Sequence, residues 1–379
     1  DLIEVKASTA VKDYYLHDMA LQRYAFMGAG YDIRKSILMH VNNQYVRTGE
    51  LDLKTLFTHE DCTGNIGEAF DAVGGELNFL LKAINSKSMP EIEIGDQCHD
   101  PFECDYLEYC WRHVPDYSVY NIFRGSKLDR LLGEQILDIV DVPDSFDTTP
   151  RQFIDIDAYK QGRVHVDQPA IREFLDELVY PLYYLDYETI NPAAPLFNQS
   201  RPYQQIPFQF SLHIQERRNG NLEHIAFLHT GQDDPRPGFI KSLISACGHS
   251  GSVVVYNQSF ESRINNELAA DFPGFADALN GITDRMVDLI IPFRSRYLYS
   301  PKTQGSASLK AVLPAFVPGM SYDDMPIGDG GTASMAYLSC IKGLVPAEEK
   351  ETIFQQLRDY CEQDTYAEVK LLEVLFKAA

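Results

Sequence analysis

From about residue 179 to its end, the chain alternates strand-like and helix-like segments, and this alternation constrains its fold most strongly. Residues 180–187 are a dense aromatic and aliphatic run. Residues 208–215 and 223–230 flank Asn219-Gly220, a dipeptide that favours a tight turn between paired strands. Residues 252–256 are typical of a buried strand, and residues 355–377 have the spacing of an amphipathic helix. The pattern predicts an α/β domain with a mixed sheet flanked by helices.

The preceding sequence predicts two further parts, because 379 residues exceed what one core usually supports. Residues 1–125 begin with a strand-like run and then show helical spacing at 17–27, 32–40 and 67–84. Residues 126–178 are polar and rich in helix signals, so we expect a helical connector there. The third part is the α/β domain at 179–379. Because the chain begins with Asp1 inside a strand-like run, we expect it to start within a larger protein.

Charge and composition exclude several classes of protein. The chain has 33 Lys and Arg against 55 Asp and Glu, a net charge of −22, which is the wrong sign for a protein that coats a phosphate backbone. No apolar run approaches the roughly 20 residues that cross a bilayer, so we expect no membrane segment. The odd number of cysteines, 7, argues against a disulfide scaffold and favours the cytoplasm.

Two acids on the first strand of the α/β domain point to a metal site. Asp186 and Glu188 stand two residues apart, so both side chains leave the same face of the sheet. Adjacent like charges are unfavourable without a positive partner, and Mg²⁺ prefers oxygen ligands. The alternative is a pair of solvated acids on an exposed strand.

Later segments add further candidate ligands. Asn257 ends the buried strand at 252–256, and Glu261 follows in the first turn of a helix, at the sheet edge where α/β proteins place ligands. Tyr360 and Asp364 lie four residues apart on one face of the last helix. Taken singly, each could be structural, since acids favour helix N-termini anyway.

In this order, the three motifs resemble the RNase H-like DEDD exonuclease superfamily, in the subgroup whose last motif carries a tyrosine. The general pattern has Asp where this chain has Glu261. The segments Tyr-Asn-x-Ser-Phe-Glu, Gly-Ser-x-Ser-Leu-Lys and Tyr-Cys-x-x-Asp-Thr are more closely similar to an uncharacterised bacterial family. In that family, the exonuclease-like domain follows a RecB-like nuclease module.

The resemblance implies a metal-dependent exonuclease. Asp186, Glu188, Glu261 and Asp364 would hold two Mg²⁺ or Mn²⁺ ions, and Tyr360 would orient the attacking water. The expected reaction is 3′ to 5′ removal of nucleotides from single strands, with DNA favoured and repair or processing as the role. The alternative class is a catalytically lapsed module that binds nucleic acid or serves as a scaffold.

A basic stretch between the second and third motifs suits a single strand of nucleic acid. Residues 285–310 carry five basic residues against one acid, with Phe293, Tyr297 and Tyr299 interleaved. The alternative is a solvated loop with buried aromatics. The residues that we expect to bind substrate are Asn257, Phe260, Arg294, Arg296, Lys302 and Lys310.

The amino-terminal part resembles the second half of a RecB-like PD-(D/E)xK nuclease. Glu4 and Lys6 form Glu-x-Lys on the first strand, and Gln22 follows on a helix. The preceding metal-binding Asp of that motif is missing, so we expect this remnant site to be inactive.

Three cysteines at short spacing predict a metal cluster, because soft thiolates select zinc or iron–sulfur clusters. The resemblance favours a 4Fe–4S cluster, for which an early fourth cysteine is missing; zinc and empty thiols are the alternatives. Cys62, His99 or His113 could complete a site. The three cysteines are Cys98, Cys104 and Cys110.

Overall fold

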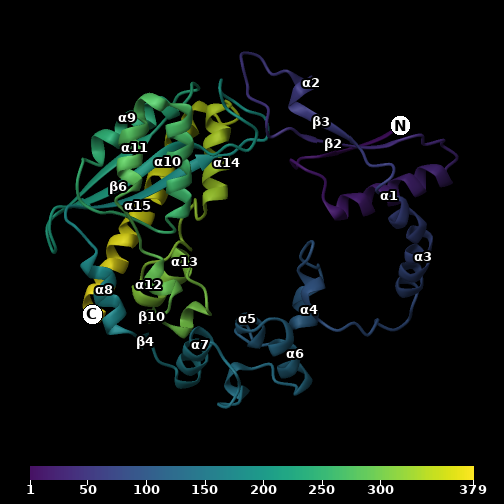
Figure 1. The fold of residues 1–379 in the computed structure, drawn as a ribbon, viewed down its shortest axis with the longest axis horizontal. Coiled ribbons are helices and arrows are strands. Elements are labelled where there is room, and N and C mark those ends of the chain that lie inside the picture. Colours follow the sequence, from purple (N-terminus) through teal and green to yellow (C-terminus); the bar gives the residue numbers. More distant parts are fainter. The chain divides into compact units, whose positions relative to one another are not determined.

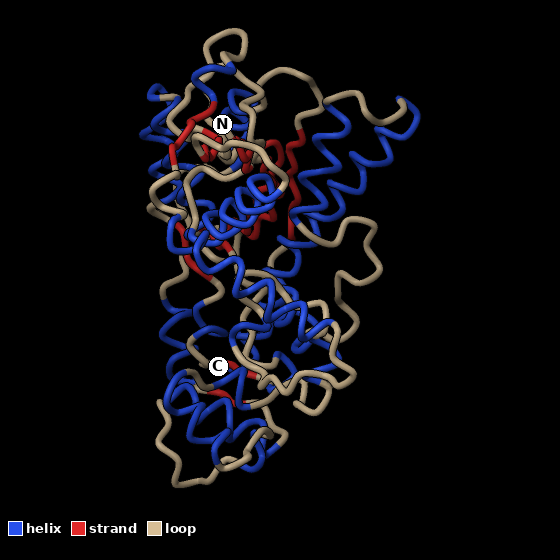
Figure 2. Tube along the Cα trace, turned by 90° about the vertical axis from the view of Figure 1, so that its right-hand side faces the viewer, coloured by secondary structure: helices blue, strands red, loops and turns tan.

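The computed structural model describes all 379 residues and divides into two compact units. The first unit comprises Asp1–His113 and Pro192–Gln204, and the second comprises Val114–Asn191 and Gln205–Ala379. Both units mix helices and strands, with helices predominating (Figure 2). This division differs from the expected boundaries at 125 and 178, because the segment expected to be a connector belongs to the second unit.

The second unit contains the predicted mixed sheet, with five strands in the order β7-β6-β5-β8-β9. β5, β6 and β7 are antiparallel neighbours, whereas β8 runs parallel to β5 and β9 parallel to β8. The prediction of an α/β domain is therefore confirmed. The strands are β5 (Leu182–Ile190), β6 (Ile206–Gln215), β7 (Leu222–Leu228), β8 (Val253–Val255) and β9 (Met286–Asp288).

The two faces of this sheet differ in polarity, because neighbouring residues of a strand point to opposite sides. Leu185 and Leu212 lie in an apolar core with α9 (Arg236–Ala246), α10 (Ser259–Asp271) and α11 (Ala276–Thr283). The opposite face carries polar side chains, and α15 (Ala347–Ala378) packs on its β5 and β6 strands (Figure 1). There Gln209 Nε2 donates to the carbonyl of Leu357 at 2.8 Å. The polar face is thus covered by α15, and α14 (Gly330–Ile341) also packs on β5.

The remaining elements of the second unit connect these layers. Two of these elements are the short strands β4 (His165–Val166) and β10 (Leu298–Tyr299), which pair in antiparallel fashion. In chain order, all of these elements are α5 (Val119–Ile122), α6 (Gly125–Gly133), η2 (Ile139–Asp141), α7 (Pro150–Gln161), β4, α8 (Gln168–Asp176), η3 (Pro273–Phe275), α12 (Ile291–Arg294), β10, η4 (Pro301–Thr303), α13 (Leu309–Phe316) and α14 (Gly330–Ile341).

Residues 126–178 pack as part of this unit because they help to form an apolar core. Val119, Phe123, Leu131 and Ile139 are fully buried in it. Asp155 of α7 accepts two hydrogen bonds from Arg296, at 2.6 and 3.1 Å, and this ion pair is buried. A linker between domains lacks such contacts.

The first unit contains a three-stranded sheet in the order β1-β2-β3. Residues 32–40, predicted as helical, instead include strand β2, which is parallel to β1 and antiparallel to β3. Pairing on both edges outweighs the helical spacing, and Leu38 and His40, two residues apart, are both buried. The elements are β1 (Leu2–Lys6), α1 (Asp13–Gly28), β2 (Ser36–Val41), α2 (Leu53–Leu56), β3 (Phe57–Asp61), α3 (Gly67–Ile84), η1 (Asp96–Cys98) and α4 (Leu107–Trp111).

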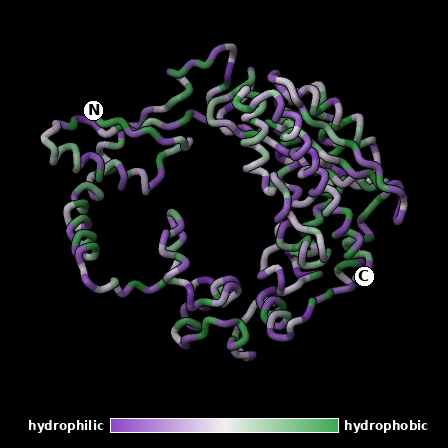
Figure 3. Tube along the Cα trace, turned by 180° about the vertical axis from the view of Figure 1, so that it is seen from behind, coloured by the Kyte–Doolittle hydropathy of each residue, from purple (hydrophilic) through white to green (hydrophobic).

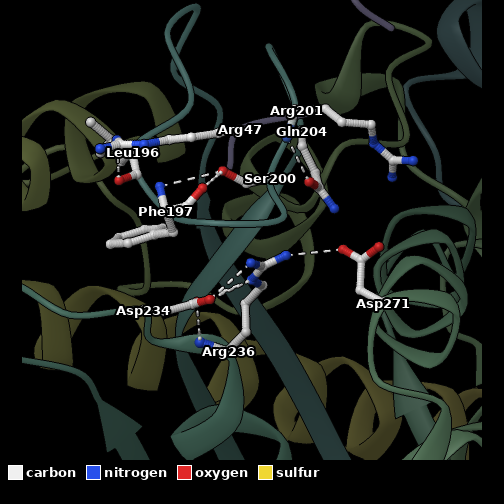
Figure 4. Close-up of polar contacts among 9 residues, drawn as sticks. All are labelled: Arg47, Leu196, Phe197, Ser200, Arg201, Gln204, Asp234, Arg236 and Asp271. Carbon is white, nitrogen blue, oxygen red and sulfur yellow. Dashed lines mark hydrogen bonds and ion pairs between the residues drawn. The ribbon is translucent and has the colours of Figure 1, made fainter. Parts of the chain in front are cut away.

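The loop between β5 and β6 contributes Pro192–Gln204 to the first unit. Arg47 donates to the carbonyl of Pro195 at 3.0 Å. It also donates to the carbonyl of Leu196 at 2.6 Å, and Ser200 Oγ donates to the carbonyl of Phe197 (Figure 4). These bonds hold the loop within the first unit, whereas the sequence predicted that it belongs to the α/β domain at 179–379.

A separate network in the second unit holds the start of α9. Arg236 is 1% exposed, pairs with Asp234 at 2.8 Å and pairs with Asp271 of α10 at 2.9 Å (Figure 4). The buried guanidinium thus joins two helices of the apolar layer.

Helix α3 of the first unit carries more hydrophobic surface than its core uses. Figure 3 shows many hydrophobic residues along this helix. Only Val73 of the helix is buried, while Phe79, Leu81 and Ile84 are more than half exposed. The helices of the structure are all too short or too polar to cross a membrane.

Candidate metal centre

Three of the predicted acids meet beneath α15. Asp186 and Glu188 project from the polar face of β5, and Asp364 comes from the middle of α15. One oxygen of each carboxylate lies within 4.8 Å of the others. Glu188 and Asp364 are 6% and 7% exposed and Asp186 is half-buried, so this cluster of acids is largely buried. The alternative of solvated acids on an exposed strand does not fit this placement.

A turn after β8 places the fourth predicted acid. Asn257 has a positive φ of 75°, which asparagine tolerates better than most residues, and the chain turns there into α10. Asp288, at the end of β9, fixes this turn by accepting the backbone N–H of Asn257 at 2.9 Å. Glu261 then lies in the first turn of α10 and is 2% exposed. It is outside the 4.8 Å group but adds negative potential at Asp186 and Glu188.

The structure adds a fifth acid, Glu368, that sequence reasoning missed. It lies four residues after Asp364 on α15, so both side chains share one face of the helix. Glu368 is 1% exposed, and burial, followed by the negative charges of Asp186 and Glu261, raises its pKa. Its spacing from Asp364 is the signal that could have identified it.

Burial is the largest cause of raised pKa values throughout this cluster. The pKa of Asp186 rises well above its ordinary value through burial and then through the charges of Asp364 and Glu188. Burial raises the pKa of Asp364 to about 7 against hydrogen bonding from Tyr322 and the charge of Lys310. It raises that of Glu261 to about 8. The charged forms of these acids therefore lack sufficient positive compensation.

Hydroxyl and thiol groups surround the acids. Tyr322 donates to Asp364 Oδ1 at 2.5 Å, and Tyr360 lies one turn before Asp364 with its ring 6.1 Å from that of Tyr322. Both burial and the neighbouring acids raise the pKa of Tyr360, so its hydroxyl keeps its proton. Cys361 Sγ is 3.4 Å from Asp186 Oδ2. The predicted tyrosine thus stands beside the acids.

The donor set fits divalent cations. None of the five acids forms an ion pair, and the buried oxygens Glu261 Oε2 and Glu368 Oε2 have no hydrogen-bond partner. A buried carboxylate without a partner is costly, and a cation bound by oxygen ligands would remove that cost. Asp186, Glu188 and Asp364 form the group that could hold such an ion.

The predicted substrate-binding residues divide into exposed and buried groups. Arg294, Lys302 and Lys310 are exposed, and the charge of Lys310 opposes the rise in the pKa of Glu188. Ser308 caps the start of α13 and so positions Lys310 in its first turn. Arg294 lies 3.9 Å from the carboxylate of Asp288, whereas Lys302 and Lys310 form no ion pair.

Arg296 does not fit its predicted contact with substrate. It is 1% exposed, because its guanidinium is bound by Asp155 and by the carbonyl of Gly305 at 2.8 Å. Phe293 and Tyr299 are also buried. For these residues, the alternative of buried side chains beneath a loop fits the structure.

The two predicted residues on the turn after β8 also differ in exposure. Asn257 is exposed, and its Oδ1 accepts from Ser259 Oγ at 3.0 Å. Phe260 is half-buried and packs against the apolar core of the sheet. Only Asn257 is fully open to a ligand.

The predicted remnant nuclease residues lie together in the first unit. Lys6 pairs with Glu4 at 2.9 Å, and Gln22 Nε2 donates to Glu4 Oε2 at 2.9 Å. Asp18 of α1, which sequence reasoning missed, pairs with Lys6 at 2.5 Å. The lysine is therefore neutralised by two acids.

The cysteines of the predicted cluster lie around η1 and α4. Cys104 is exposed, while Cys98 and Cys110 are half-buried. They are not among the two groups of ligand atoms that gather within 4.8 Å. Cys62, a candidate fourth ligand, is instead buried beside Met19 in the core of the first unit. The iron–sulfur or zinc site stays a prediction.

The fold and this site define a mixed α/β protein with a buried carboxylate cluster suited to divalent cations. A family described as a domain of unknown function (DUF2779) matches residues 183–308. This range includes Asp186, Glu188 and Glu261 but ends before Asp364.

Relatives among curated proteins match about half of the chain. The uncharacterized protein MG366 of Mycoplasma genitalium is 28% identical over 207 residues, which are 50% of this chain and 31% of that protein. The uncharacterized protein UU173 of Ureaplasma parvum is 26% identical over 232 residues, 55% of this chain and 33% of that protein. The matches thus span about a third of these relatives. No solved structure matches the chain.

Proposed function

We propose that the second unit is a metal-dependent 3′ to 5′ exonuclease with an RNase H-like fold, acting on single-stranded nucleic acid, with DNA favoured. The observation that carries this proposal is the meeting of Asp186, Glu188 and Asp364 within 4.8 Å on a buried sheet face. Carboxylate oxygens are the ligands that hard divalent cations such as Mg²⁺ and Mn²⁺ prefer.

The topology supports the proposal. Three antiparallel strands followed by two parallel ones, in the order β7-β6-β5-β8-β9, suit an RNase H-like sheet with the first acids on the central strand. Asp186 and Glu188 come from β5, Glu261 follows β8, and Asp364 comes from the last helix. The order of the acids along the chain and their position on the sheet agree with the three motifs.

Each group in the site has a distinct role in this reaction. When bound, two divalent cations lower the pKa of an attacking water and stabilise the leaving 3′ oxygen. Asp186, Glu188 and Asp364 would hold the cations, and the unpaired oxygens of Glu261 and Glu368 would add to the donor set. Because its hydroxyl stays protonated, Tyr360 orients the water by hydrogen bonding and does not remove its proton.

Exposed basic groups bind the strand. Lys310, beside the acids, contacts a phosphate near the scissile bond, while Arg294 and Lys302 bind phosphates further away. The negative charge of the whole chain opposes tight coating of nucleic acid, so binding depends on these local cations and on the metal.

Cleavage of strands labelled at one end tests the proposal. With Mg²⁺ or Mn²⁺, the protein is expected to shorten a 5′-labelled single strand one nucleotide at a time, and Asp186→Asn and Asp364→Asn are expected to abolish this activity. Glu173→Gln, at an exposed position on α8, is the matched control. DNA and RNA are tested side by side.

Intact substrate, with parent and Asp186→Asn indistinguishable, would exclude the exonuclease. If the inactive parent still binds single strands, the second candidate, a catalytically lapsed binding module, is favoured. Two observations support this candidate: Arg296 is buried, and Glu261 stands where the general pattern has Asp.

A further inference from the structure

A second group of potential ligands lies on the same polar face of the sheet, where α15 packs against β6 and β7. His213 of β6 and His224 of β7 are register partners, and their rings stack with centroids 4.5 Å apart. Glu362 of α15 completes the group, and one ligand atom from each residue lies within 4.8 Å of the others. None of these residues belongs to the carboxylate cluster.

We propose that His213, His224 and Glu362 form a zinc site that joins β6, β7 and α15. Two imidazoles with one carboxylate are a ligand set typical of Zn²⁺, whereas Mg²⁺ prefers oxygen alone. The inference is independent of the proposed exonuclease activity.

The hydroxyl groups beside the histidines set the protonation of their rings. Thr365 Oγ1 lies 3.2 Å from the carbonyl of Glu362, to which it can donate its only proton. It then accepts from Ser211 Oγ at 2.8 Å and from His213 Nδ1 at 2.8 Å. Ser211 Oγ in turn accepts from His224 Nε2 at 2.9 Å.

This hydrogen-bond chain leaves one nitrogen of each ring free to bind a metal. With protons on His213 Nδ1 and His224 Nε2, the lone pairs are on His213 Nε2 and His224 Nδ1. Histidine ligands in metal sites are commonly fixed by such a bond from the other ring nitrogen. Ser211 and Thr365 therefore act as positioning residues.

The separation of two of the ligand atoms is close to what zinc requires. Ligand atoms about 2.0–2.1 Å from a tetrahedral ion stand about 3.3 Å apart. His224 Nδ1 and Glu362 Oε1 are 3.7 Å apart, so a small rotation of the half-exposed Glu362 side chain brings this pair to that separation. Because the two imidazole rings stack, one ring must also turn for both free nitrogens to face one ion. His213 is buried, and the open side at Glu362 leaves room for water as a fourth ligand.

Zinc binding by chelator-stripped protein tests this site. Titration is performed with excess Mg²⁺ to occupy the carboxylate cluster and in a background where the three clustered cysteines are replaced by serine. We expect one equivalent of Zn²⁺, a higher melting temperature, and at least tenfold weaker binding in His224→Gln and Glu362→Gln. The matched controls are His249→Gln and Glu173→Gln, both at exposed positions.

Cobalt substitution gives a second measurement that does not depend on stability. The visible spectrum of bound Co²⁺ is expected to show a site of nitrogen and oxygen ligands without thiolate charge transfer, and His224→Gln is expected to remove it. Absence of zinc binding in the parent, or equal affinity in the parent and both site variants, would overturn the proposal.

Discussion

Replacing Glu188 with glutamine is expected to stabilise the metal-free protein while removing its response to Mg²⁺. Glu188 is 6% exposed and shares its site with Asp186 and Asp364. Its raised pKa results from burial and then from the charge of Asp364. Glutamine has nearly the same shape and no charge, so the folded protein no longer holds this acid beside others.

The size of the effect follows from the geometry. For unit charges at the 4.8 Å limit of the group, an effective dielectric constant of about 20 gives roughly 3.5 kcal/mol of repulsion. Lys310 offsets part of it, since its charge opposes the rise in the pKa of Glu188. We expect a net stabilisation of about 1–2 kcal/mol, which for a unit of this size raises the melting temperature by roughly 2–8 °C.

Calorimetric unfolding with a chelator and with Mg²⁺ measures both effects. The parent is expected to gain stability on adding Mg²⁺, and Glu188→Gln to gain little because a ligand is lost. Glu173→Gln, exposed on α8, controls for the loss of one charge. If Glu188→Gln melts at or below the parent temperature in chelator, the acids do not repel one another and the reasoning fails.

Three further predictions concern groups outside the acids. Arg296→Leu is expected to lower the free energy of unfolding by about 3–5 kcal/mol, because Asp155 stays buried without its partner. Urea unfolding should show most of this stability recovered in the double variant Arg296→Leu/Asp155→Leu, and no recovery would contradict the pairing. Burial raises the pKa of Cys247 to about 12, so its thiolate is scarce below that pH. When folded protein is alkylated between about pH 7 and about pH 10, mass spectrometry should find Cys247 unmodified. Labelling that rises across this range would refute its burial. Lys310→Met should weaken the binding of single strands and reduce the slope of log affinity against log salt concentration by about 0.7. Fluorescence anisotropy with Ca²⁺ present measures this slope. A slope equal to that of the exposed control Lys54→Met would exclude a phosphate contact.

The sequence by itself predicted four of the five strands of the large sheet, because their signals are local, and it did not predict β9. Strand β5 and helix α15 were expected from a dense apolar run and from helical spacing, and both are present with somewhat longer bounds. The two-residue period of β5 fixed that Asp186 and Glu188 share a face, and the four-residue spacing on α15 did the same for Tyr360 and Asp364. Both pairs depend only on backbone geometry within one element.

Only the tertiary structure decided which residues meet and which are buried. Local spacing predicted a helix at residues 32–40, but pairing with β1 and β3 on both edges forms strand β2 there. The sequence also predicted that Arg296 binds substrate, because its partner Asp155 lies 141 residues away and could not be identified locally. Glu368 joined the acids because α15 lies on the polar face of the sheet, and His213 met His224 through strand register. These contacts depend on how separate elements pack, and packing is set by the whole chain and not by any one segment.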